Sequence, residues 1–366
     1  MREDAMRQDL QGRTAKTMSG MKAIDLFPYW GDNRALIIEA ARALHDEDLD
    51  VRPAPDFRSI GDVLRHLITT EEYWWHGGIQ GESYARWRDV DWEHLGDHEK
   101  DARRRQRFPT VQSILEGLLA AHAPVEGFLA ELDAADLCEK RRATWAQDNT
   151  LRWVLWHLVE HDQHHRAQLY TRIRMLGREP VPIWPRPQVM AQTPAAGWID
   201  GEATMADVVP FWKQVNGRLR EAVAELTADD LRFAPFPSHP TIHDLVLHLI
   251  LEEDFVIRQH LGGQNGTAPG GIQEGFRRIP VSRAAQEAGR GFPTVSSLLA
   301  ALDAVHAETR RIVDGLSVRD LARTLETPAG PETVHHALWY AREHTVHHRA
   351  QLFLCMRMRG RTPPTV

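Results

Sequence analysis

The sequence matches itself at an offset of 182 to 184 residues, and this repeat constrains the fold more than any other feature. The segment that ends at Trp30 corresponds to the segment that ends at Trp212. The closest match lies near the end of each copy, where EHDQHHRAQL at 160–169 pairs with EHTVHHRAQL at 343–352. Solenoid repeats are about 20–50 residues long, so a repeat of this length predicts two copies of a whole domain.

Proline marks the boundary between the two copies. The segment after the first copy contains Pro182, Pro185, Pro187 and Pro194. Proline at this density opposes both helix and sheet, which indicates a linker. We therefore predict a first domain over 21–180, a proline-rich linker over 181–204 and a second domain over 205–366. The polar leader over 1–20 is expected to be disordered.

Each copy contains four segments in which apolar residues recur at intervals of three and four, the period of an amphipathic helix. In the first copy these helices are predicted over 26–45, from Ser59, from Thr110 and over 150–175; in the second they are predicted over 208–226, from Thr241, from Thr294 and over 333–358. Strand signals are weak throughout. The sequence therefore predicts an all-α fold of two tandem four-helix bundles related by a pseudo-twofold axis.

The last helix of the first copy carries two histidines that are candidates for metal binding. His161 and His165 are four residues apart, so they share one face of a helix and could reach one ion. A third candidate is His66, which lies within an apolar stretch of the second helix and should point inward. Three imidazoles with one open position suit catalytic zinc, and also iron or nickel.

The second copy repeats this arrangement with His248, His344 and His348. Spacing alone leaves open a pair that uses His164 in the first copy or His347 in the second. A single histidine on an apolar face is usually a hydrogen-bonded core residue. The three positions differ from this case because they recur together in both copies, which favours a metal triad in each.

One histidine of the second helix, followed on a later helix by His-x-x-x-His and Arg-x-Gln, resembles the DinB/YfiT-like metalloenzyme superfamily over both copies. The resemblance implies a divalent metal bound by the second-helix histidine and by the two histidines four apart, which selects against His164 and His347. The implied ligands are His66, His161, His165, His248, His344 and His348. Members of the family usually contain one bundle and often pair as homodimers, so this chain is expected to mimic such a dimer and to be stable as a monomer.

Some members of this superfamily activate a low-molecular-weight thiol such as mycothiol or bacillithiol. The resemblance therefore implies a thiol-dependent S-transferase or isomerase that acts on a small electrophilic molecule. A different metal enzyme, either a hydrolase or an iron-dependent oxygenase, is an alternative. A metal-stabilised binding or stress-response module without enzyme activity is another.

Charged residues near the histidines could assist the metal site. Glu71 and Glu253 follow the second-helix histidines by five residues, which is about 140° around a helix, so a direct ligand role is doubtful. Glu252 follows His248 by four residues and is better placed, but Thr70 occupies its position in the first copy. Arg166 and Arg349 could bind a carboxylate or form a salt bridge within the bundle.

Composition narrows the class of partner. The formal net charge of -7 opposes nucleic acid as a partner, because phosphate binding requires clustered Lys and Arg. No run reaches the roughly 18 apolar residues of a membrane span, and residues 1–20 contain no apolar stretch typical of a signal peptide. The only cysteines, Cys138 and Cys355, cannot form a disulfide framework. We therefore expect a cytoplasmic protein that acts on a small molecule.

Overall fold

The computed structural model contains two compact units, Met1–Ala203 and Thr204–Val366. It describes residues 22–27, 30–82, 97–142, 148–183, 212–261, 292–327 and 330–365. The predicted leader and most of the predicted linker lie outside these residues. The helices of the first unit are α2 (Trp30–Arg42), α3 (Ile60–Tyr73), α5 (Asp97–Arg107), α6 (Val111–Glu131) and α7 (Leu151–Met175). Those of the second unit are α9 (Trp212–Ala224), α10 (Ala228–Leu231), α11 (Ile242–Glu253), α13 (Val295–Asp314) and α14 (Val334–Met358).

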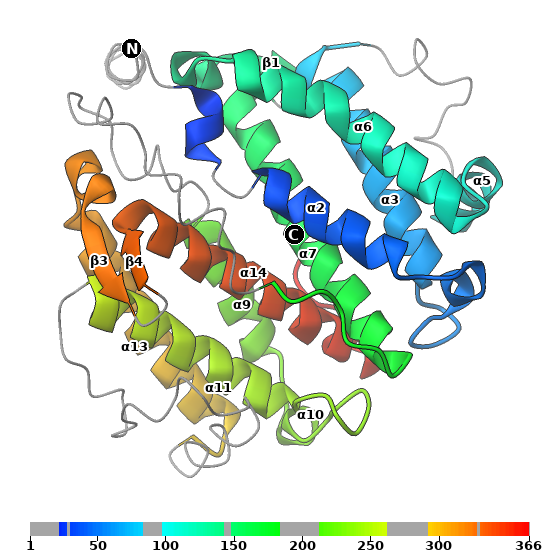
Figure 1. Ribbon diagram of the computed structural model, residues 1–366. Helices are drawn as coiled ribbons and strands as arrows, with labels where there is room; N and C mark the ends of the chain where they lie inside the picture. The colour runs from blue at the N-terminus through cyan, green and yellow to red at the C-terminus, as the bar shows by residue number, and fades with distance from the viewer. Residues whose placement is uncertain are drawn as a thin grey trace. The chain divides into compact units, whose positions relative to one another are not determined.

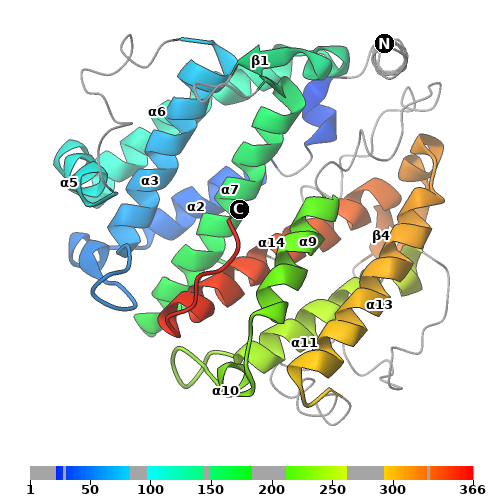
Figure 2. The same cartoon turned by 180° about the vertical axis from the view of Figure 1, so that it is seen from behind.

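Each unit is a four-helix bundle with the same arrangement of helices. In the first unit, α2 packs against α6 and α7, and α3 packs against the same two helices (Figure 1). In the second unit, α9 and α11 both pack against α13 and α14. The second and fourth helices of each bundle are therefore neighbours, as Figure 2 shows for α3 and α7. This confirms the prediction of two tandem four-helix bundles.

The second helix of each bundle begins with a capping box. The hydroxyl of Ser59 accepts a hydrogen bond from the Asp62 amide, and the Asp62 carboxylate accepts one from the Ser59 amide. Thr241 and Asp244 form the same pair at the start of α11. Each box satisfies two amides that the first turn of a helix leaves without partners, which fixes where the helix starts.

The fourth helix of each bundle is 25 residues long and has both ends determined by sequence. Thr150 and Thr333 are the N-caps, and each hydroxyl accepts a hydrogen bond from an amide in the first turn. After the helices end, Gly177 and Gly360 adopt φ angles of 72°. Glycine adopts this left-handed conformation without steric cost, so it terminates helices readily.

Several elements differ from the prediction. In the first bundle, α2 ends at Arg42 rather than at 45, and a separate 3₁₀ turn at Ala23–Leu26 precedes it. Two antiparallel hairpins that the strand signals of the sequence do not predict precede the fourth helices. Their strands are β1 (Lys140–Arg142), β2 (Asp148–Thr150), β3 (Thr324–Thr327) and β4 (Gly330–Thr333). With three or four mostly polar residues each, these strands are too short to show an alternating pattern.

Short π-helices continue the second helix of each bundle. Trp74–Ile79 follows α3, and Asp254–Leu261 follows α11. A π-helix has more residues per turn than an α-helix, and each of these two directly follows the helix that carries a candidate ligand histidine. Such π-helical turns are frequent at functional sites. Among the described residues, no helix combines the length and apolarity needed to cross a membrane.

Candidate metal centre

The first candidate site lies where α3 packs against α7. Nε2 of His66 is 3.0 Å from Nε2 of His161. The ring centroid of His165 lies 4.7 Å from that of His66 and 4.4 Å from that of His161. One ligand nitrogen of each ring lies within 4.8 Å of the others, and all three side chains are partly exposed. The structure therefore brings together the three predicted residues in a cluster that could hold an ion and admit a ligand.

The second site has the same geometry between α11 and α14. The Nε2 atoms of His248 and His344 are 2.8 Å apart. The ring of His348 is centred 4.6 Å from that of His248 and 4.5 Å from that of His344. One ligand nitrogen from each ring of this second triad also lies within 4.8 Å of the others. All six predicted histidines therefore lie in two matching triads.

These distances suit a single ion in each triad. Two nitrogens bound tetrahedrally at about 2.0–2.1 Å from zinc are about 3.3 Å apart. The closest nitrogen pairs, at 3.0 and 2.8 Å, are slightly shorter than this and would need only a small ring movement. Imidazole nitrogens suit zinc, iron and nickel alike, so the donor set does not distinguish these metals.

The protonation state of the triads also suits a metal. Burial, and then repulsion between neighbouring imidazolium rings, lowers the pKa of His66, His161 and His165 well below the usual value. The same two causes lower the pKa of His248 and His344. These five rings are therefore neutral at pH 7, and the neutral imidazole is the form that binds a metal.

In each triad, a hydrogen bond on the far side of one ring orients that ring toward the centre of the triad. Thr70 Oγ1 lies 3.3 Å from Nδ1 of His66. Gln351 Oε1 lies 2.8 Å from Nδ1 of His348. Because an amide oxygen can only accept, this Nδ1 carries the proton, and Nε2 of His348 offers its lone pair to an ion.

The alternative histidines lie outside both triads. His164 is buried and bonded to the Gln168 side chain at 2.9 Å, and His347 contacts the Gln351 side chain at 3.3 Å. His157 stacks on Trp153, with centroids 5.1 Å apart and an interplanar angle of 5°. The choice against His164 and His347 therefore agrees with the geometry.

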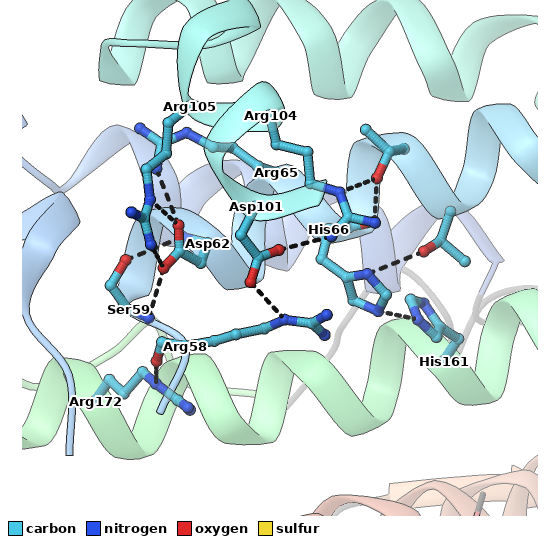
Figure 3. A network of polar contacts seen from close by, with 12 residues as sticks. Arg58, Ser59, Asp62, Arg65, His66, Asp101, Arg104, Arg105, His161 and Arg172 are labelled. Carbon is cyan, nitrogen blue, oxygen red and sulfur yellow. Dashed lines mark hydrogen bonds and ion pairs between the residues drawn. The ribbon is translucent and has the colours of Figure 1, made fainter. Parts of the chain in front are cut away.

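The surroundings of the first triad are basic (Figure 3). Arg58 and Arg104 both bond to Asp101, at 3.3 and 2.7 Å. The charge of Arg58 contributes to the lowered pKa of every histidine in this triad, after burial and the neighbouring histidines. Sequence reasoning missed Arg58, because it lies in a loop and Pro240 takes its place in the second copy.

The second triad has an acidic neighbour instead. Glu252 on α11 accepts a hydrogen bond of 2.8 Å from the Tyr340 hydroxyl on α14. The Tyr340 ring in turn stacks on His344, with centroids 5.9 Å apart. The prediction that Glu252 is better placed than Glu253 is consistent with this arrangement, in which Glu252 lies beside the triad but outside it.

Glu71 and Glu253 belong to buried polar networks away from the triads. Glu71 bonds to Arg34 at 2.5 Å and to His122 at 2.8 Å. Glu253 accepts hydrogen bonds from Asn216 and Thr309, and His306 lies 3.3 Å from it. His122 is therefore a hydrogen-bonded core residue, and neither Glu71 nor Glu253 belongs to a triad.

The arginines that follow the last ligands are buried inside the bundles. Arg166 is fully buried and donates a hydrogen bond of 2.5 Å to Asn33 on α2. Arg349 is equally buried, with its guanidinium over the Phe353 ring. Both therefore stabilise helix packing rather than offering a surface for a carboxylate ligand.

Comparison with known families agrees with the repeat. The sequence profile of the DinB family matches residues 15–194, and that of the DinB superfamily matches residues 212–352. No curated protein and no solved structure matches the chain. The two profile matches together cover most of the sequence and both histidine triads. The chain therefore belongs to the DinB superfamily and carries two copies of its domain in tandem.

Proposed function

We propose that the chain is a metal-dependent enzyme with one divalent ion in each bundle. The enzyme either transfers a low-molecular-weight thiol to a small electrophilic molecule or isomerises such a molecule with the help of the thiol. The observation that carries this proposal is the pair of matching triads, each with its ligand nitrogens within 4.8 Å of one another. The choice of a thiol comes from the resemblance to thiol-dependent members of the superfamily.

Each part of the site has a defined role in this proposal. A divalent ion held by three neutral ligands keeps its full charge and lowers the pKa of a bound thiol or water. His66, His161 and His165 would hold the ion in the first bundle, and their partial exposure leaves one side open to a ligand. Thr70 would keep the His66 ring oriented through its contact with Nδ1.

A hydrolase is the second candidate, and the position of Glu252 favours it at the second triad. Hydrolysis needs a carboxylate near the ion to accept a proton from water. Glu252 lies beside this triad and is held by Tyr340. The first bundle has Thr70 at the matching position, so a proton acceptor of this kind is specific to the second site.

The first test is the metal content of protein purified without an affinity tag. We expect about two ions per chain, falling by one in His161→Ala and by one in His344→Ala. His157→Ala is the matched control, because His157 shares α7 with the ligands but lies outside the triad. Protein that stays metal-free after reconstitution with zinc, nickel and iron would overturn the catalytic proposal and leave a binding module.

A second test separates thiol chemistry from hydrolysis. Metal-loaded protein is incubated with a thiol and an electrophile, and both are quantified. A transferase consumes the thiol in proportion to product, and an isomerase requires the thiol without consuming it. Turnover that proceeds equally well without any thiol would reject the thiol-dependent reaction and favour hydrolysis.

A further inference from the structure

Arg58 has two terminal nitrogens that no described residue occupies. Its Nε donates to Asp101 at 3.3 Å, and its backbone carbonyl accepts a hydrogen bond of 3.2 Å from Arg172. No hydrogen bond joins either Nη atom to any part of the chain that the structure describes. The side chain is 29% exposed, so a ligand can reach it from solvent. The guanidinium is thus fixed at one end and available at the other.

The free end of this guanidinium faces the first metal site. In Figure 3, Arg58 extends along α7 below Asp101, with its terminal nitrogens toward His66 and His161. The charge of Arg58 also contributes to lowering the pKa of all three histidines of the triad, which agrees with this placement.

Several guanidinium groups lie close to the first triad. Asp101 accepts a hydrogen bond from Arg58 on one oxygen and from Arg104 on the other, so one carboxylate serves both guanidinium groups. Arg172 adds a third guanidinium, directed at the Arg58 and Gln168 carbonyls. A divalent ion in the triad would increase the positive charge further. Like charges in a partly buried site repel strongly unless a negative group joins them.

The second bundle lacks this arrangement at the matching positions. Pro240 replaces Arg58 and the buried Cys355 replaces Arg172. The causes that lower the pKa of His248 and His344 are burial and neighbouring histidines. Glu252 adds a carboxylate beside the triad. The two triads are alike, but a guanidinium lies beside the first and a carboxyl group lies beside the second.

We propose that the first site binds a small molecule that carries a carboxylate, which Arg58 holds through its two terminal nitrogens while another group of the same molecule faces the histidine triad. A carboxylate has two coplanar oxygens that match two parallel N–H donors of a guanidinium. Arg58 is then a specificity-determining residue of the first site only. This inference rests on the proposed metal site and deepens it, because it names the class of ligand.

The experiment uses the full chain loaded with Co²⁺, whose thiolate charge-transfer band reports ligand binding directly. His344→Ala confines the ion to the first site, and His161→Ala confines it to the second. The two probes are 3-mercaptopropionate and 3-mercapto-1-propanol, which differ in the carboxylate. At the first site we expect 3-mercaptopropionate to bind about tenfold more tightly than the alcohol, the effect of one charge-assisted contact.

Arg58→Gln in the first-site protein should remove most of this preference and leave the affinity for the alcohol unchanged. Arg58→Lys keeps the charge without the paired donors and should restore part of it. At the second site the two probes should differ little. Far-UV circular dichroism verifies that each variant is folded, and a cobalt content of about one per chain verifies that one site is loaded. If Arg58→Gln does not fold, the comparison is made with Arg58→Lys.

Two results are decisive against the proposal. An unchanged preference in Arg58→Gln, or an equal preference at both sites, would show that the carboxylate acts on the ion alone and would overturn it. Failure of the first site to bind Co²⁺ at all would instead reject the metal site, and the ligand class would fall with it.

Discussion

Tyr340 on α14 donates a hydrogen bond of 2.8 Å to Glu252 on α11, and the same tyrosine ring stacks on the candidate ligand His344. Burial raises the pKa of Glu252, and the hydrogen bond from Tyr340 offsets only part of this effect. The second bundle therefore keeps a carboxyl group next to its triad that is costly to ionise.

Glu252→Gln should stabilise the metal-free protein at neutral pH. The native-state pKa of Glu252 lies above its unfolded value of about 4.5, so the unfolded state loses its proton first as pH rises. Stability is therefore lost as pH increases through the native pKa, and glutamine removes this loss while retaining an acceptor for Tyr340. Urea unfolding at pH 4 and pH 8 measures the effect, which should disappear at pH 4. A variant less stable than the parent at pH 8 would contradict this account.

Asp62 should stabilise the first bundle, and this contribution should disappear in acid. Burial alone would raise the pKa of Asp62, but hydrogen bonds from Arg105 and Ser59 outweigh burial and lower it to about 2. Because the native pKa is below the unfolded value of 3.8, the contribution is present above pH 4 and is lost as pH falls toward 2. We expect Asp62→Asn to cost about 1–2 kcal/mol at pH 7, discounted for solvent screening, and little at pH 2.

The control for this variant is Asp244→Asn. Asp244 caps the equivalent helix but pairs with His243 rather than with an arginine. Its loss should therefore cost less at pH 7, as measured by urea unfolding. Equal losses at pH 2 and pH 7 for Asp62→Asn would mean that its charge does not stabilise the fold.

The buried network of the first bundle should tolerate a paired change better than a single one. Arg34 contacts Glu71 at 2.5 Å and Asp162 at 3.0 Å, and the second bundle has Asn216 and Thr345 in place of Arg34 and Asp162. Arg34→Asn leaves two buried carboxyl groups without their cation, which should cost about 3–5 kcal/mol.

The double variant Arg34→Asn, Asp162→Thr reproduces the second bundle and should recover at least half of that loss. Burial already raises the pKa of Asp162 to about 6, so its ionised carboxylate destabilises the bundle further once Arg34 is removed. Chemical denaturation of the full chain compares the variants, and Asn216→Arg is the reciprocal control, which should destabilise the second bundle. If the double variant is as unstable as the single one, the two positions are not coupled.

Both metal sites should retain their ions in mildly acidic buffer. Burial lowers the pKa of the triad histidines, so protons compete with a metal only well below the usual value of 6.5. Three ligands with an ordinary pKa would each lose about tenfold in availability at pH 5.5. We expect metal content after dialysis to be the same at pH 7.5 and pH 5.5. A loss centred near pH 6.5 would mean that the rings titrate like exposed histidines.

The repeat made the bundles and the triads predictable from sequence. Periodic apolar residues identified the helices, and His66 was paired with His161 and His165 because the same three positions recur as His248, His344 and His348. Capping residues such as Thr150 gave correct helix starts, because their hydroxyl satisfies a local amide and requires no knowledge of tertiary contacts.

Glu252 could be singled out from its spacing to His248, but Arg58, which distinguishes the first site, could not. Arg58 lies in a loop without periodicity, and its partner Asp101 comes from α5, far away in sequence. The rotation of about 140° between His66 and Glu71 follows from their spacing on one helix. The partners of Glu71 do not, because Arg34 and His122 come from other helices.

The paired histidines lie near the middle of helices that are 25 residues long and buried along most of their length. Backbone amides in such a position exchange hydrogen with solvent only when a large part of the bundle opens, whereas helix ends fray freely. The candidate ligand histidines thus lie on backbone that should exchange slowest in each bundle. Five of the six histidine side chains are partly exposed, so an ion could enter or leave without that backbone opening. Metal exchange should therefore be far faster than the deuterium uptake of these histidines.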